Sequence, residues 1–186
     1  LTDDNFATIV GAVREGRSIY DNIKKFIRYM LACNLGEVIT MFLGILCGLP
    51  LPLYPIQILW VNLATDGLPG IALGMDCPAH DIMERPPVPA SRGIFAGKMM
   101  RLIITRGLLI GLCTLGAFVT VSWSCGSVES GRTAAFVTLV LAQLIHSFEC
   151  RSDTKGLLHI DLRENLLLVA ANAVSVLMML AVIYIV

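Results

Sequence analysis

The chain has 186 residues, of which 56% are hydrophobic and only 15% are charged, with 14 basic and 14 acidic side chains. Soluble globular domains carry about 25% charged residues, so this composition excludes an ordinary water-soluble domain. The balanced charge, with no basic stripe, also argues against a nucleic-acid partner. We therefore expect a protein that has the lipid bilayer as its solvent.

Residues 1–25 precede the first long apolar stretch and have a different pattern. Thr2, Asp3 and Asp4 are residue types that cap helices, and apolar residues recur at helical spacing from Phe6 onward. We expect an amphipathic stalk helix that runs into the first span. Its acidic residues favour packing against a cytoplasmic domain over lying on the membrane surface.

Five apolar stretches are each long enough to cross a hydrocarbon core about 30 Å thick, since a helix rises about 1.5 Å per residue. They predict an all-α fold, a polytopic transmembrane helix bundle over residues 26–186. The predicted spans are 26–49, 54–75, 100–123, 133–150 and 165–186. A short proline-rich turn joins the first two spans, so we expect them to be antiparallel neighbours. An odd number of spans, the last ending flush at Val186, suggests part of a longer protein.

The charged segments between the spans predict the orientation of the chain. If the N-terminus is cytoplasmic, thirteen of the 14 basic residues lie on the cytoplasmic side and only Arg132 lies outside. This is the distribution that the positive-inside rule describes. The largest cytoplasmic connection, the loop 76–98, contains four prolines. We expect it to be irregular but stiff, because each proline fixes φ.

The six cysteines show no C-x-x-C spacing, and most lie in or beside apolar runs. Only Cys125 falls in the predicted outer loop. We expect free thiols that behave as small hydrophobic side chains, not a disulfide framework.

Two carboxylates lie deep in predicted spans, Glu37 in the first and Asp66 in the second. An ionisable side chain at mid-bilayer costs about 2.5–3.5 kcal/mol on insertion scales, so such residues are rare without a function. Asn34 shares a helix face with Glu37 because the two are three residues apart. Asn62, Thr65 and Asp66 likewise follow the spacing of one helix face. The two oxygen-rich faces are therefore expected to meet at the same depth.

The second span contains helix-breaking residues directly after Asp66. Pro69 removes a backbone donor and clashes with the preceding turn, and Gly67 and Gly70 weaken the helix further. We expect the helix to break or unwind just after Asp66. Broken helices at membrane depth expose carbonyl groups, which transporters use to hold ions.

The side-chain oxygens of these residues suit a calcium ion. Asn34, Asn62 and Thr65 offer one oxygen each, and Glu37 and Asp66 offer one or two each. Calcium prefers about six to eight hard oxygen ligands, and a set without His or Cys argues against zinc or copper. The alternative is that the residues only join helices by hydrogen bonds.

Gln143 in the fourth span has two interpretations that the sequence leaves open. It is either a further oxygen ligand or a hydrogen-bonding residue of a helix contact. His146 lies three residues later on the same face, and we expect it to be structural.

Four segments carry a resemblance to a known family. They are DDNFATIVGAVREGRSIYDNIKKFIRY at 3–29, NLGEV at 34–38, WVNLATDGLPGIALG at 60–74 and DIMERPP at 81–87. The chain resembles the C-terminal transmembrane region of P-type ATPases, specifically the type II calcium-transporting group. The resemblance is collinear over residues 1–100 and weaker over 100–186, where the span pattern and RSD at 151–153 carry it.

The resemblance implies that the spans correspond to the fifth to ninth of ten transmembrane helices. Residues 1–25 would be the end of the phosphorylation domain and a stalk helix, and the loop 76–98 would couple that domain to the membrane. In the family, calcium is coordinated at the positions of Asn34, Glu37, Asn62, Thr65 and Asp66. Asn62 favours a calcium pump, since sodium/potassium pumps carry Asp at that position.

The resemblance also implies what the intact protein contains and does. It would be an ATP-hydrolysing pump that exports Ca²⁺ from the cytoplasm and returns protons on its site carboxylates. Mg²⁺ and ATP would bind outside this chain, which lacks the phosphorylated-aspartate motif D-K-T-G-T. Its partners would be the lipid bilayer and the rest of the pump: the phosphorylation, nucleotide-binding and actuator domains and the first four and tenth helices. Short loops favour a bacterial plasma membrane.

Several alternatives remain open at this point. Gln143 aligns with an acidic eighth-helix ligand of the family, so the stoichiometry is one or two calcium ions. A second possibility is a P-type pump for another cation, Na⁺ or Mn²⁺. A third is a non-enzymatic channel or membrane scaffold.

Overall fold

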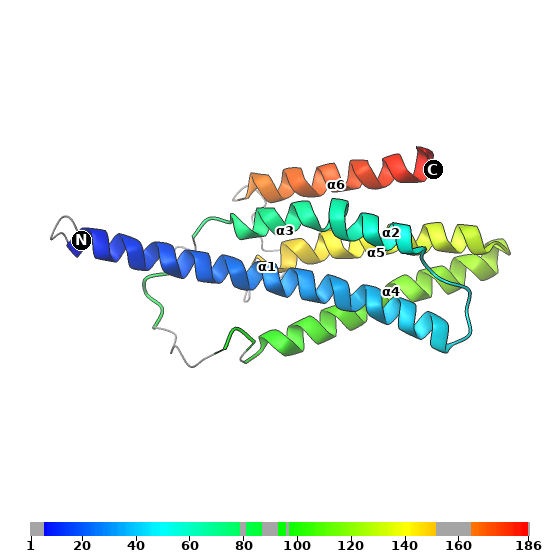
Figure 1. The fold of residues 1–186 in the computed structure, drawn as a ribbon, viewed down its shortest axis with the longest axis horizontal. Helices are drawn as coiled ribbons and strands as arrows, with labels where there is room; N and C mark the ends of the chain where they lie inside the picture. The colour runs from blue at the N-terminus through cyan, green and yellow to red at the C-terminus, as the bar shows by residue number, and fades with distance from the viewer. Residues whose placement is uncertain (1–5, 79–80, 87–92, 96, 152–164, 186) are drawn as a thin grey trace.

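The structure is a computed structural model, which describes residues 6–78, 81–86, 93–95, 97–151 and 165–185. This part of the chain contains helices and no strand, so the predicted all-α bundle is confirmed. The elements are α1 (Phe6–Leu46), α2 (Pro55–Trp60), the π-helical turn η1 (Val61–Thr65), α3 (Gly67–Gly74), α4 (Met99–Cys125), α5 (Val128–Glu149) and α6 (Leu166–Ile185) (Figure 1).

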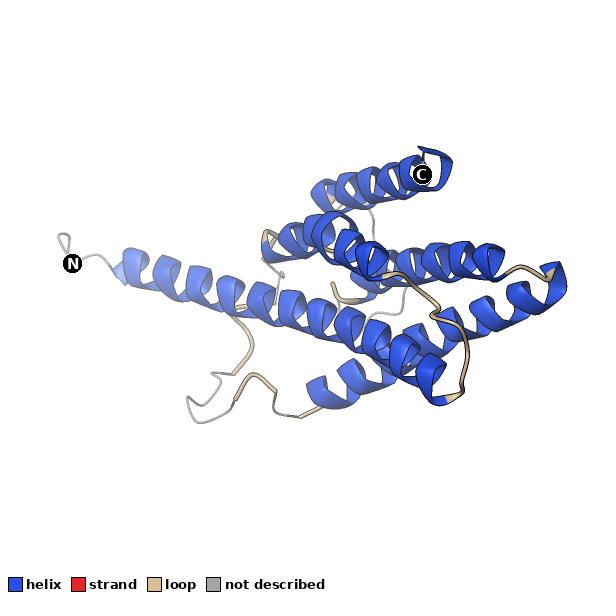
Figure 2. Cartoon of the chain, turned by 45° about the vertical axis from the view of Figure 1, so that its right-hand side comes forward, coloured by secondary structure: helices blue, strands red, loops and turns tan. Residues whose placement is uncertain are grey.

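These elements form five helical rods that are long and apolar enough to cross a membrane, counted over the described residues. α2, η1 and α3 follow one another end to end and make one rod, Pro55–Gly74. The five rods overlap the five predicted spans. α1 is longer than its predicted span because the stalk helix continues into it without a break, and its first turns extend beyond the other helices (Figure 2).

Some predictions fall on residues that the structure does not describe. The predicted capping residues Thr2, Asp3 and Asp4 and two prolines of the loop 76–98, Pro87 and Pro89, lie outside the described residues. All six cysteines are described, and all are free thiols, as predicted.

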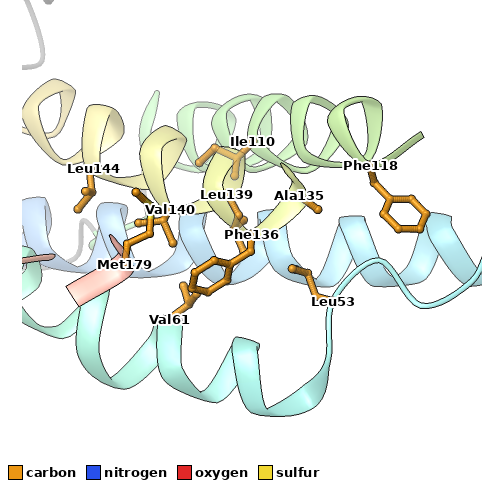
Figure 3. Close-up of a cluster of buried hydrophobic side chains, with 10 residues drawn as sticks. All are labelled: Leu53, Val61, Ile110, Phe118, Ala135, Phe136, Leu139, Val140, Leu144 and Met179. Atoms are coloured by element: carbon orange, nitrogen blue, oxygen red, sulfur yellow. The ribbon is translucent and has the colours of Figure 1, made fainter. Parts of the chain in front are cut away.

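α5 supplies the centre of the bundle (Figure 3). Its buried side chains recur at a spacing of three and four residues, which makes one apolar face. Packed with residues from the neighbouring helices, they form a cluster of Leu53, Val61, Ile110, Phe118, Ala135, Phe136, Leu139, Val140, Leu144 and Met179. The same face continues with Gln143, which is fully buried. The apolar packing of α5 therefore carries a polar amide into the interior of the bundle.

α1 and α4 cross in close contact through glycines. A Cβ added to Gly107 would lie 2.8 Å from the Leu35 side chain, and one added to Gly36 would lie 2.7 Å from Ile110. The hydroxyl of Thr40 donates to the Gly36 carbonyl at 2.8 Å and lies 3.3 Å from the Gly111 carbonyl. Small residues let helix backbones approach closely in a bilayer, so this contact fixes α4 against the stretch of α1 that contains Glu37.

The segment after α3 lies against the extended part of α1. Arg17 of α1 donates to the carbonyl oxygens of Ile82 at 2.9 Å and Arg85 at 2.7 Å. Arg85 in turn pairs with Asp21 at 2.9 Å and with Asp81 at 2.8 Å. These contacts tie the described part of the loop 76–98 to the stalk.

Gly111→Ala should destabilise the bundle, because the new Cβ would lie 2.7 Å from the Ile39 side chain and 2.9 Å from the Gly36 carbonyl oxygen. Overpacking of this kind costs about 1–3 kcal/mol. Heating the detergent-solubilised full-length protein and following its monodisperse fraction should show a lower midpoint. Gly116→Ala in the same helix is the control, since no atom lies within 4 Å of its new Cβ. Equal midpoints for the two variants would contradict the close α1–α4 contact.

Candidate cation site

The Glu37 side chain lies inside the bundle and is held by amides from two other helical elements. Its residue is only 4% exposed. Asn62 Nδ2 of η1 donates to Glu37 Oε2 at 2.7 Å, and Gln143 Nε2 of α5 donates to Oε1 at 3.0 Å. Hydrogen bonds to a charged acceptor are stronger than those between neutral groups. One carboxylate therefore joins α1, η1 and α5 at a single point.

Asp66 is the second buried carboxylate, at the junction of η1 and α3. The Tyr29 hydroxyl of α1 donates to its Oδ1 at 3.1 Å. Within the described chain, Asp66 Oδ2 and Gln143 Oε1 are buried oxygens without a hydrogen-bond partner. Because most buried polar atoms are hydrogen-bonded, these two unpartnered oxygens mark this part of the interior as a candidate cation site.

The main chain departs from the α-helix directly before Asp66. The N–H of Asp66 donates to the carbonyl of Val61, five residues earlier, at 2.9 Å, which is the π-helical pattern. The predicted unwinding after Asp66 is wrong, because α3 begins at Gly67 and continues to Gly74. Pro69 is the third residue of this new helix. N–H groups of a first helical turn have no intrahelical partner, so the proline is tolerated there.

Thr65 has two oxygens in the irregular turn, its carbonyl and its hydroxyl, and each takes part in one hydrogen bond. Pro69 has no N–H to offer the Thr65 carbonyl, and the Ser175 hydroxyl of α6 donates to it at 3.2 Å instead. The Thr65 hydroxyl donates to the Val61 carbonyl at 2.9 Å, which leaves the lone pairs of its oxygen available. Thr65 is completely buried, so both of its oxygens lie in the bundle interior.

Five of the six predicted ligands lie around one stretch of the second rod: Glu37, Asn62, Thr65, Asp66 and Gln143. Four of them are buried and Asn62 is half-buried. Asn34, also half-buried, lies on α1 one turn before Glu37, and in the described chain it forms no hydrogen bond to another of these side chains. The assignment of all six as ligands remains a prediction.

A profile of the family described as "Cation transporting ATPase, C-terminus" matches residues 50–186. The chain belongs to this family. The matched region covers α2 through α6 and thus includes Asn62, Thr65, Asp66 and Gln143.

Three relatives of this cation-transporting ATPase chain come from bacteria. It is 53% identical over 185 residues to the calcium-transporting ATPase of Bacillus subtilis, which covers 99% of this chain and 21% of that protein. It is 44% identical over 199 residues to calcium-transporting ATPase 1 of Bacillus cereus, covering 98% of this chain and 22% of the relative. Calcium-transporting ATPase 1 of Lactococcus lactis is 41% identical over 168 residues, which cover 89% of this chain and 19% of that protein. The chain thus spans about a fifth of the length of these relatives.

Sequence reasoning missed two residues of this ATPase chain that contact the candidate site. Tyr29 lies two turns before Glu37 and bonds Asp66, and its hydroxyl at the start of an apolar run was the available signal. Ser175 of α6 supplies the hydrogen bond that Pro69 cannot. Neither contact follows from spacing along one helix, because each joins two different rods.

Gln143→Leu should lower the apparent affinity for the activating cation by about tenfold, since it removes a hydrogen bond to a charged group and an unpartnered oxygen. The measurement is the cation dependence of ATP hydrolysis by the full-length protein. Gln57→Leu is the control, because Gln57 accepts from Tyr54 N–H at 2.9 Å at the far end of α2. An unchanged affinity in an inserted Gln143→Leu protein would remove Gln143 from the site.

Proposed function

We propose that the intact protein is a P-type ATPase that exports Ca²⁺ from the cytoplasm in exchange for protons, and that this chain supplies part of its ion-binding site. The observation that carries the proposal is the pair of buried carboxylates, of which Glu37 accepts from two amides and Asp66 from the Tyr29 hydroxyl. Two buried carboxylates in a bilayer carry a large cost unless a cation or protons neutralise them. The names of three bacterial relatives, all calcium-transporting ATPases, support the same choice.

The available donor set consists of hard oxygens. In the described part of the chain, no three His, Cys, Asp or Glu side chains come together as a transition-metal site would require. Carboxylate, amide, hydroxyl and carbonyl oxygens are the ligands of calcium. A divalent cation also balances the two carboxylates, whereas a monovalent ion would leave one buried negative charge unpaired.

Cation binding requires a rearrangement of the amides. Asn62 and Gln143 now present N–H donors to Glu37, and an N–H cannot coordinate a cation. Rotation of each amide by half a turn exchanges its nitrogen for its oxygen. Both amides would then join the carboxylates as ligands, and Glu37 would exchange two hydrogen bonds for one ion.

The same two buried carboxylates support proton counter-transport. When the cation leaves, Glu37 and Asp66 remain buried in one site. Protonation removes the cost of two like charges in a medium of low polarity. The site would therefore reopen toward the cytoplasm with both carboxylates protonated, and the protons would leave there.

ATP and Mg²⁺ would bind in domains outside this chain. The exposed apolar residues Ile9, Val10 and Val13 on the extended part of α1 suit a contact with the phosphorylation domain. The contacts of Arg17 on α1 with the segment after α3 suit the coupling role proposed for the loop 76–98. The positive-inside rule supports a cytoplasmic location for this end of the bundle, and the bacterial relatives support a bacterial plasma membrane.

Asp66→Asn should abolish calcium-dependent phosphorylation by ATP while the protein still inserts into the membrane. The substitution keeps the shape of the side chain and removes one of the two charges that balance Ca²⁺. The measurement is acid-stable phosphoenzyme formed by full-length protein in membrane vesicles with and without calcium. Asp21→Asn, which makes the same exchange at a partly exposed position on α1, should phosphorylate normally. Near-normal transport by Asp66→Asn would remove Asp66 from the site.

Calcium should be the cation that activates the wild-type pump. Radioactive calcium uptake into inverted vesicles, with Mn²⁺ and Na⁺ as competitors, separates the candidate ions. We expect uptake that Na⁺ leaves unchanged, because one positive charge does not balance two carboxylates. Failure of calcium to support phosphoenzyme formation, with success of another cation, would favour the second candidate, a pump for that ion.

A further inference from the structure

The side chain of Asp76 lies where several segments meet, at the end of the bundle from which α1 extends. It follows α3 directly and is 4% exposed. Its Oδ2 lies 2.7 Å from Lys25 Nζ of α1 and 3.6 Å from Arg151 Nε, just after α5. Its Oδ1 accepts from Asn165 Nδ2 at 2.8 Å and from the N–H of Cys77 at 3.1 Å. A buried charge held by this many partners fixes the segments that supply them.

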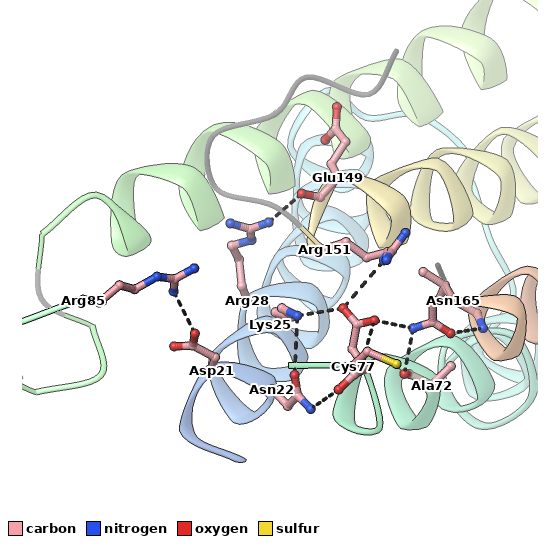
Figure 4. A network of polar contacts seen from close by, with 12 residues as sticks. Asp21, Asn22, Lys25, Arg28, Ala72, Cys77, Arg85, Glu149, Arg151 and Asn165 are labelled. Carbon is pink, nitrogen blue, oxygen red and sulfur yellow. Dashed lines mark hydrogen bonds and ion pairs between the residues drawn. The ribbon is translucent and has the colours of Figure 1, made fainter. Parts of the chain in front are cut away.

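The main chain of Asp76 holds neighbouring helices as well as its side chain does. Figure 4 shows Asn22, Lys25, Arg151 and Asn165, which come from different segments, in one network of polar contacts. Asn22, one turn before Lys25 on α1, donates to the Asp76 carbonyl at 2.7 Å. Asn165 bridges Asp76 to α6, because its own side-chain oxygen accepts from Leu168 N–H at 2.8 Å. Asn165 Nδ2 also lies 3.5 Å from the Ala72 carbonyl oxygen, so the end of α3 is attached twice to α1 and twice to Asn165 at the start of α6.

Polar contacts join α1 to the second rod, or to the residue just after it, at three points along α1. In order along α1, these contacts are Lys25 with Asp76, Tyr29 with Asp66, and Glu37 with Asn62. Between Asp66 and Asp76 lie the eight residues of α3, about 12 Å of helix, followed by Met75. Because α3 is a continuous helix, the attachment of Asp76 sets the height and rotation of Asp66 relative to Glu37.

We infer that Asp76, through its ion pair with Lys25, is a positioning residue that holds Asp66 in register with Glu37 for cation binding. The inference rests on the proposed function, and it adds a residue that touches none of the six predicted ligands. Loss of the pair leaves every ligand chemically intact but lets α3 shift against α1. Cation binding then weakens, while the maximal rate at saturating cation is retained.

The test uses full-length protein in inverted vesicles and measures calcium uptake over a range of calcium concentrations. Asp76→Asn should raise the calcium concentration for half-maximal uptake by roughly 3- to 30-fold, the range of coupling effects in such networks. Lys25→Met should give a similar rise, and the double variant should be no worse than Asp76→Asn alone. Lys25→Arg, which keeps the charge, should behave as wild type.

Asp21→Asn is the matched control. It makes the same exchange and breaks the more exposed pair with Arg85, which also joins α1 to the segment after α3. Exposed ion pairs contribute little, so its half-maximal calcium concentration should equal that of wild type. A half-maximal concentration in Asp76→Asn equal to that of wild type, or a double variant whose shift is the sum of the single shifts, would overturn the inference.

Failed membrane insertion of Asp76→Asn and a wild-type pump that calcium does not activate are two further possible outcomes. If Asp76→Asn fails to insert, Lys25→Met and Lys25→Arg decide, because Asp76 then keeps Arg151 and Asn165 as partners. A higher half-maximal calcium concentration in Lys25→Met but not in Lys25→Arg supports the inference, and equal concentrations in these two variants refute it. A wild-type pump that calcium does not activate defeats the proposed function, whereas an activated wild type with unshifted variants defeats the inference alone.

Discussion

Burial of the Glu37 carboxylate between helices is the constraint on which the rest of this structure depends. An isolated charge there would carry a high desolvation cost, and Asn62 and Gln143 lower it with two hydrogen bonds. Those bonds require η1 and α5 to lie beside α1 at one depth. The apolar face of α5 and the glycine contact between α1 and α4 provide that placement. The apolar packing between the helices therefore makes the hydrogen bonds to Glu37 possible.

The π-helical turn resolves a conflict within the second rod. A proline in the middle of an α-helix removes a hydrogen bond and clashes with the carbonyl four residues earlier. The extra residue of η1 ends one helix and starts another, so Pro69 falls in the first turn of α3. Asp66 lies at that junction, and Ser175 donates to the Thr65 carbonyl that Pro69 leaves without a partner. The site therefore has its irregular backbone without an unwound segment facing lipid, which a bilayer would not tolerate.

The polar contacts of α1 extend well beyond the candidate site. From its exposed end inward, α1 is bonded to the loop after α3 by Arg17, to the end of α3 by Asn22 and Lys25, and to Asp66 by Tyr29. A displacement of the extended part of α1 therefore acts on α3 through several contacts at once. The proposed coupling between cytoplasmic domains and the candidate site would use this continuity.

The amino-acid sequence predicts the all-α bundle, its apolar rods and the candidate cation-binding residues, because bilayer thickness and the cost of buried charge act on the local sequence. It also predicts an irregularity beside Asp66, since proline and glycine act within a few residues. The packed helices show that the irregularity is a π turn before Asp66 and that Tyr29 and Ser175 bond the second rod. Among the described residues, Asn34 bonds none of the other predicted ligands. The attachment of Asp76 to Lys25 and Asn165 also appeared only in three dimensions. These contacts join residues far apart in the chain, and their existence depends on how whole helices are placed, which no local pattern encodes.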